Sequence, residues 1–128
     1  MNRGVHISDA VRTFSWSLVL VVAAVAIAMA HLAPTRTMPE AESVVTESPG
    51  QLQVWFTQDP DSAVSQLTLE GPDGQVEIGE TTVAEEKSLV AMVPVQLAPG
   101  SYTVGWRSAG DDGHARRGDF AFTVHPGE

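Results

Sequence analysis

The chain contains no cysteine among its 128 residues. Disulfides and thiolate metal sites are therefore excluded, and any exported domain must be stable through its hydrophobic core alone. Helical periodicity is also missing after residue 30. No G-x-S-x-G nucleophile motif, glycine-rich phosphate loop, dinucleotide-binding fingerprint or EF-hand spacing occurs. These absences count against serine hydrolases, nucleotide-binding enzymes and EF-hand calcium proteins.

Basic residues are scarce beyond residue 30. Residues 31–128 carry five basic and fifteen acidic side chains, a net charge of −10. A domain of this charge is repelled by nucleic acids and by anionic lipid, so we expect neither as a partner. Such a surface attracts cations, although net charge alone selects none of them.

The first thirty residues differ sharply in composition from the rest. Arg3 and Arg12 precede the uncharged run SLVLVVAAVAIAMA, which ends in Ala28-Met29-Ala30. A basic segment, an apolar segment and a small-x-small triplet are the three parts of a secretory signal peptide. We therefore predict a signal peptide over 1–30 and a periplasmic or extracellular protein that begins at His31. The alternative is an uncleaved membrane anchor, because the whole uncharged stretch has about the 20 residues that a spanning helix needs.

Residues 31–128 suffice for one small domain, and they show short strands separated by turn residues. Strands with period-two alternation or apolar runs are predicted at 51–57, 63–70, 75–78, 87–97, 101–107 and 119–124, and around Val44 and Val45. Pro94 indicates an edge position or a bulge. This spacing predicts an all-β fold of about seven strands, a small sandwich or barrel. Its aromatic core is expected from Trp55, Phe56, Trp106, Phe120 and Phe122.

One loop, SAGDDGHARRGD at 108–119, combines acids, a histidine and arginines between the two most regular strands. Asp112 and His114 are separated only by Gly113. Side chains two positions apart lie on the same side of extended or tightly turned backbone, so this carboxylate and imidazole can converge on one ion. The alternative is a polar hairpin loop without a ligand, since Asp and Gly are common turn residues.

A histidine at a free amino terminus strengthens the metal-binding interpretation. The α-amine and the ring Nδ1 of His31 can bind one metal as a chelate. Together with Asp112 and His114 they supply three nitrogens and one oxygen. Cu(II) prefers a tetragonal set of nitrogen and oxygen ligands and heads the affinity order of divalent ions, whereas zinc gains less from these ligands. We therefore predict a site for one Cu(II) ion and no catalytic residue.

Three stretches of the chain are similar to a known family. LAPGSYTVGWRSAGDDGHARRGDFAFTV, residues 97–124, resembles the C-terminal signature of the CopC family of periplasmic copper-binding proteins. That signature reads L-x-P-G-x-Y-x-V-x-W-R, a short loop, D-G-H, a glycine and an F-x-F-T-V strand. VWFTQDP at 54–60 is similar to the family's F-[ST]-E-P stretch. The family also begins at a histidine exposed by signal cleavage and has Ser/Thr-x-Pro nearby, here Thr37-Met38-Pro39.

The resemblance implies a small Greek-key β-sandwich, Ig-like or cupredoxin-like, for residues 31–128. It implies a Cu(II) site made by the amine and ring of His31 with Asp112 and His114. The implied function is non-enzymatic: sequestering, buffering or delivering copper outside the cytoplasmic membrane in copper homeostasis or resistance. A polytopic membrane copper transporter of the CopD type is the implied partner, and we expect a monomer.

Two departures from the family pattern have consequences. Pro34 stands where the family often has leucine, so we expect a displaced start of the first strand. Some members have a methionine-rich loop for Cu(I), whereas only Met38 and Met92 remain here after signal removal. The sequence therefore argues against a separate Cu(I) site.

Two other function classes stay open. Lytic polysaccharide monooxygenases also bind copper through an N-terminal histidine brace, but they need an open metal position and a broad aromatic-bearing surface. Here Asp112 would fill an equatorial position, and the aromatic residues follow the strand pattern. The other class is a metal-free sandwich-type interaction module. It would be favoured if a His114→Ala variant bound copper as well as the parent.

Overall fold

A computed structural model of the chain describes residues 31–127. The predicted signal peptide over 1–30, and the anchor that is its alternative, lie outside these residues. The core side chains all lie between Leu32 and Val124, so this part of the chain carries its own hydrophobic core. No helix able to cross a membrane occurs within the described range.

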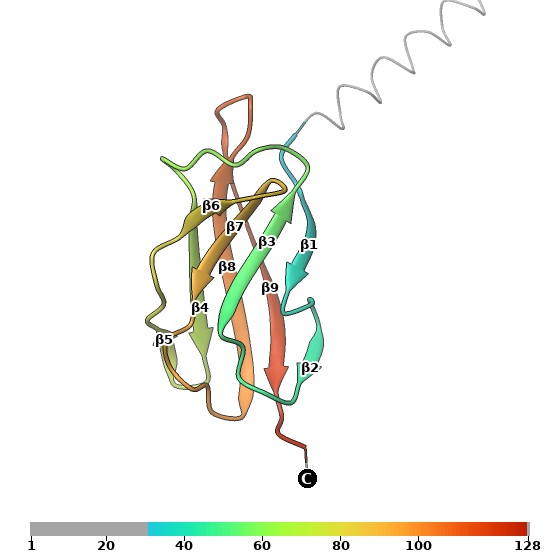
Figure 1. Cartoon of the computed structure of the whole chain (residues 1–128), viewed down its shortest axis with the longest axis vertical. Coiled ribbons are helices and arrows are strands. Elements are labelled where there is room, and N and C mark those ends of the chain that lie inside the picture. The colour runs from blue at the N-terminus through green and yellow to red at the C-terminus, as the bar shows by residue number, and fades with distance from the viewer. Residues whose placement is uncertain (1–30, 128) are drawn as a thin grey trace, which may run out of the picture. The chain divides into compact units, whose positions relative to one another are not determined.

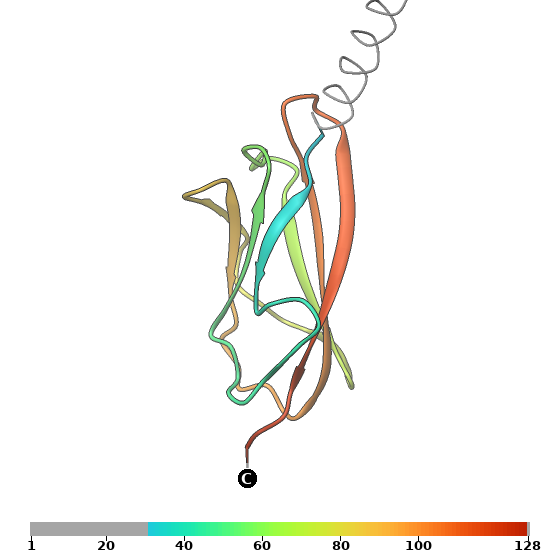
Figure 2. The same ribbon diagram turned by 90° about the vertical axis from the view of Figure 1, so that its right-hand side faces the viewer.

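The described residues form nine strands. They are β1 (Pro34–Met38), β2 (Ser43–Val45), β3 (Gln51–Phe56), β4 (Gln66–Gly71), β5 (Gly74–Val76), β6 (Thr82–Ala84), β7 (Ser88–Met92), β8 (Gly100–Ala109) and β9 (Ala115–Val124). One sheet, the β3 sheet, has the order β1-β3-β7-β6, and the other, the β8 sheet, has the order β2-β9-β8-β4-β5. Neighbouring strands are antiparallel except β2 and β9, which run parallel. Figure 1 and Figure 2 show the two sheets packed as layers, which confirms the predicted all-β sandwich.

Alternation along the strands builds the core between these layers. In β3, Leu52, Val54 and Phe56 are buried, while the residues between them are only half-buried. Apolar side chains at every second position face inward because successive side chains of a strand point to opposite faces. Phe56 of the β3 sheet meets Trp106 of the β8 sheet edge to face, with ring centroids 5.2 Å apart. This contact joins the two layers near the end of the sandwich where β8 finishes.

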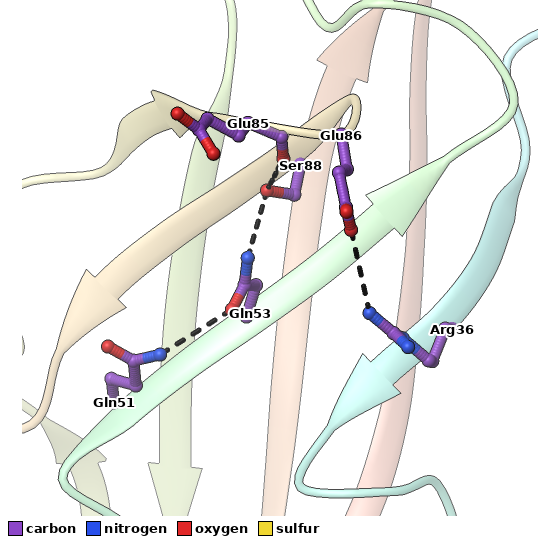
Figure 3. A network of polar contacts seen from close by, with 6 residues as sticks. All are labelled: Arg36, Gln51, Gln53, Glu85, Glu86 and Ser88. Carbon is purple, nitrogen blue, oxygen red and sulfur yellow. Dashed lines mark hydrogen bonds and ion pairs between the residues drawn. The ribbon is translucent and has the colours of Figure 1, made fainter.

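Trp55 lies outside the core, so its prediction as a core aromatic is wrong. It follows the alternation of β3 and points to the outer face of the β3 sheet. There the Arg36 guanidinium lies 3.8 Å from the centroid of its ring. Arg36 also reaches Glu86, with 4.0 Å between nitrogen and oxygen, as Figure 3 shows. The cation and the exposed side of the indole cover each other, which makes an outward tryptophan tolerable in water.

A series of polar contacts crosses the same outer face. The Gln53 amide donates to Ser88 Oγ at 3.0 Å, and that hydroxyl donates to the Glu85 carbonyl at 2.7 Å (Figure 3). Ser88 is fully buried, so these bonds satisfy a hydroxyl that water cannot reach. These hydrogen bonds fix the turn between β6 and β7 against β3.

The strand boundaries differ from the prediction in several places. β1 and β6 are both absent from the strands predicted from the pattern. β1 contains few apolar residues, and β6 is too short to have a measurable period. β7 ends at Met92, so Pro94 lies beyond the strand and marks neither an edge nor a bulge. β8 ends at Ala109 and β9 begins at Ala115. The loop predicted at 108–119 is therefore shortened to residues 110–114. The pairing of β1 with β3 is irregular between Pro34 and Arg36, at the start of the strand where the sequence predicts a displacement.

Candidate metal site

The β8–β9 turn presents Asp112 and His114 at one end of the sandwich. The Gly113 amide donates to the Gly110 carbonyl at 3.0 Å, which closes the turn. Gly113 has φ +72°, a left-handed conformation that glycine adopts without a steric penalty. Asp112 Oδ1 accepts from the His114 amide at 3.0 Å, the local bond by which aspartate stabilises turns. The residues of the D-G-H motif therefore determine the shape of the turn.

The two side chains lie on the same side of this turn. Asp112 Oδ2 and His114 Nδ1 are 3.7 Å apart, and the His114 side chain is 83% exposed. Two atoms that bind one metal at about 2.0–2.2 Å lie about 3 Å apart in a tetragonal arrangement. A small side-chain rotation therefore suffices for both to bind one ion, which can approach directly from solvent.

Leu32 and Ala33 are held beside this turn. Leu32 is 3% exposed, and its Cβ lies 3.3 Å from the point that a Cβ on Gly110 would occupy. The Ala33 amide donates to Thr57 Oγ1 at 3.1 Å, and the Thr57 amide donates to the Ala33 carbonyl at 2.9 Å. In Figure 1 and Figure 2 the start of β1 and the β8–β9 turn lie at the same end of the sandwich.

His31 itself is exposed and directly precedes the buried Leu32. Within residues 31–127, no group of three or more His, Asp or Glu side chains is arranged to hold a metal ion. The structure thus brings together Asp112 and His114, two of the three predicted ligands. In the uncleaved chain the main-chain nitrogen of His31 belongs to a peptide bond and cannot be the predicted amine ligand. The complete ligand set would exist only after cleavage.

Gln58 was not among the predicted site residues. Its side-chain Oε1 accepts from the Asp111 amide at 3.0 Å, although the two residues are 53 positions apart. A second bond, from the Asp61 amide to the Ala109 carbonyl at 2.9 Å, ties the same loop to the end of β8. The only sequence signal was the VWFTQDP stretch, which contains Gln58. The loop after β3 is therefore the support on which the D-G-H turn rests.

Negative charge accumulates at this end of the molecule. Asp59, Asp61, Asp111 and Asp112 are exposed on the two loops that these bonds join. Arg116, two positions after His114, is a nearby positive group, and its Nε is buried without a hydrogen-bond partner within the described residues. Clustered carboxylates raise the local concentration of cations and speed their arrival. The electrostatics therefore favour a divalent cation over an anion at this turn.

Replacing Gln58 with alanine is expected to loosen the turn without unfolding the domain. The variant loses one side-chain acceptor, worth about 1 kcal/mol, or about fivefold in an equilibrium constant. We expect faster hydrogen exchange at the Asp111 amide and, if the turn holds the Cu(II) ion predicted from the sequence, Cu(II) binding weaker by about fivefold. Gln96→Ala is the matched control, because Gln96 is exposed in the loop between β7 and β8. Equal exchange and equal affinity in both variants would contradict a supporting role for Gln58.

Comparison with known proteins decides the family. The model of the CopC domain matches residues 34–125. The chain belongs to the CopC family. The matched CopC region contains all nine strands with Asp112 and His114, whereas His31 precedes it.

Related proteins agree with this assignment. The chain is 31% identical over 106 residues to copper resistance protein C of Escherichia coli, covering 76% of this chain and 83% of that protein. It is 28% identical over 98 residues to protein YobA of Escherichia coli strain K12, covering 74% of this chain and 79% of YobA.

Solved CopC-family structures share the fold. The crystal structure of CopC from Methylosinus trichosporium OB3b matches with a TM-score of 0.69 at 29% identity, covering 77% of this chain and 97% of that one. PcoC, described as a methionine-rich copper resistance protein from Escherichia coli, matches with a TM-score of 0.68 at 28% identity, covering 75% and 100%. Residues 31–128 of this CopC-family chain contain only Met38 and Met92, so a methionine-rich segment is missing there.

Proposed function

We propose that this chain is an exported CopC-family protein that binds one Cu(II) ion in copper homeostasis or resistance. The observation that carries the proposal is the convergence of three segments at one end of the sandwich. Leu32 packs beside Gly110, Gln58 holds the Asp111 amide, and Asp112 and His114 share the turn that follows. Relatives named for copper resistance support copper as the cargo.

The proposed ligands are the amine and ring of His31, Asp112 and His114. Cleavage after Ala30 would turn the peptide nitrogen of His31 into an amine, which then chelates the metal together with the imidazole. Consecutive Cα atoms are 3.8 Å apart, so the anchored Leu32 limits how far His31 can move from the turn. Three nitrogens and one carboxylate oxygen suit Cu(II) better than Zn(II) in a tetragonal arrangement.

Binding rather than turnover is the proposed activity. Protein ligands would fill all four tetragonal positions, which leaves none of them for oxygen or a substrate. The protein would then sequester or buffer copper, or deliver it to a polytopic membrane transporter. We propose that it does so as a monomer in the periplasm or outside the cell.

The direct test is a copper titration of the protein that begins at His31, with electron paramagnetic resonance of the loaded form. We expect one Cu(II) per chain and a tetragonal spectrum with coupling to nitrogen. Zn(II) is expected to compete poorly, in keeping with its place below copper in the affinity order. A protein that takes up no Cu(II) stoichiometrically, or that prefers Zn(II), would refute the proposal.

A further inference from the structure

Two arginines face each other on the outer side of the β8 sheet. Arg107 of β8 and Arg117 of β9 are direct partners in the strand register, and both side chains are exposed. Like charges directly opposite each other in a sheet are destabilising. Residues 31–128 have only five basic side chains against fifteen acidic ones, so a generally basic surface does not account for this pair.

Neither guanidinium is neutralised by a neighbour. Within residues 31–127 neither Arg107 nor Arg117 has a carboxylate within 4.0 Å. Neither side chain makes a hydrogen bond or lies over a ring within the same residues. Asp119 shares the outer face, two positions after Arg117, yet pairs with neither arginine. The pair therefore keeps its donors available.

A hollow of about 300 Å³ lies beside the two arginines. Gln66 and Thr68 of β4 line it from the other side, and Gly105 contributes to its lining. The Thr68 hydroxyl lies over Gly105, because a Cβ at this position would come within 2.6 Å of Thr68 Oγ1. Guanidinium, amide and hydroxyl groups can all donate hydrogen bonds, and no carboxylate lines the hollow.

We infer that Arg107 and Arg117 form a binding site for a small oxyanion, a carboxylate or phosphate group of a small molecule. Guanidinium forks match the oxygen spacing of such groups and bind them bidentately. The volume is at the lower end of the range of small-molecule sites, so it suits a compact ligand. The bound anion relieves the repulsion between the arginines, while the net charge of −10 excludes long polyanions.

The test is a titration of the metal-free, isotope-labelled protein from His31 to Glu128, followed at its backbone amides. Inorganic phosphate and malonate are the two probes, with ionic strength held constant by sodium chloride. We expect saturable shifts at Gly105, Arg107 and Arg117 in the millimolar range with at least one probe, and a higher melting temperature. Tighter binding of phosphate or of malonate identifies which oxyanion chemistry the site prefers. Shifts that follow chloride alone, or no saturable shift with either probe, overturn the inference.

Variants locate the site. Arg107→Gln and Arg117→Gln are each expected to weaken binding at least about tenfold, since each removes charge-assisted hydrogen bonds. Asp119→Asn is expected to strengthen it, because a negative charge on the same face is removed. Arg36→Gln is the matched control on the opposite sheet and should leave affinity unchanged. Undiminished binding in the Arg107→Gln, Arg117→Gln double variant overturns the inference, and the amide map of the parent decides the matter if that variant fails to fold.

Discussion

An acetylated serine placed ahead of His31 is expected to lower Cu(II) affinity more than about 100-fold. The added residue converts the amine of His31 into a peptide nitrogen and leaves only the ring to bind. Losing groups that merely orient a ligand already costs about 10–100-fold in metal affinity, so losing a ligand and its chelate costs more. Acetylation is needed because a new free amine close to a histidine can itself bind Cu(II).

The measurement compares competitive copper titrations of three proteins. One begins at His31, one carries acetyl-serine before His31, and one carries an extra serine after the last residue, Glu128, as the control. The extended amino terminus should also change the resonance spectrum, because one nitrogen leaves the metal. Leu32 stays buried in all three proteins, so melting of the metal-free forms should be equal. Equal copper affinity in the first two proteins would eliminate the amine from the ligand set.

The second large effect is expected at His114. Replacing it with alanine removes an imidazole that is 83% exposed, so stability should change little while Cu(II) affinity falls more than about 100-fold. His125→Ala is the matched control. His125 is also exposed but follows β9, at the end of the sandwich opposite the turn (Figure 1).

Asp112→Asn separates the proposed role of Asp112 as a metal ligand from its hydrogen bond within the turn. The amide oxygen can still accept from the His114 amide, so the turn should persist while the anionic ligand is lost. We expect a fall in copper affinity of more than about tenfold with little change in melting temperature. If His114→Ala bound copper as well as the parent, the metal-free interaction module would become the better interpretation. Reduced melting temperatures in both variants, with affinity unchanged, would mark the D-G-H motif as purely structural.

Strand alternation carried most of the fold prediction. Inward residues at every second position of β3, β8 and β9 are visible in the sequence, because a strand repeats its side-chain direction every two residues. The same rule places Trp55 outward, between Val54 and Phe56. The prediction of Trp55 as a core residue was wrong because it relied on the hydrophobicity of aromatic residues and not on this alternation. β6 escaped detection because the pairing of Thr82 to Ala84 with β7 is a tertiary event without a local pattern.

The candidate site also combines features that local sequence predicts with features that depend on tertiary packing. Asp112, Gly113 and His114 are adjacent in the chain, and their turn is built from bonds among residues 110–114, so local sequence sufficed to propose it. Gln58 lies 53 positions from the amide it holds, and Thr57 lies 24 positions from Ala33. No periodicity links such residues, since their contacts depend on how the two sheets pack.

The sequence by itself determined the strand faces, the D-G-H turn and the chemistry of the candidate ligands, because these depend on side-chain type and on neighbours a few residues away. Only the tertiary structure decided that Leu32 packs beside Gly110 and that the loop after β3 supports the turn. It also fixed the register of the β8–β9 hairpin, which puts Arg107 opposite Arg117. The contacts of Leu32 and Gln58 join distant parts of the chain, and burial of the shared core, rather than local conformational preference, stabilises them.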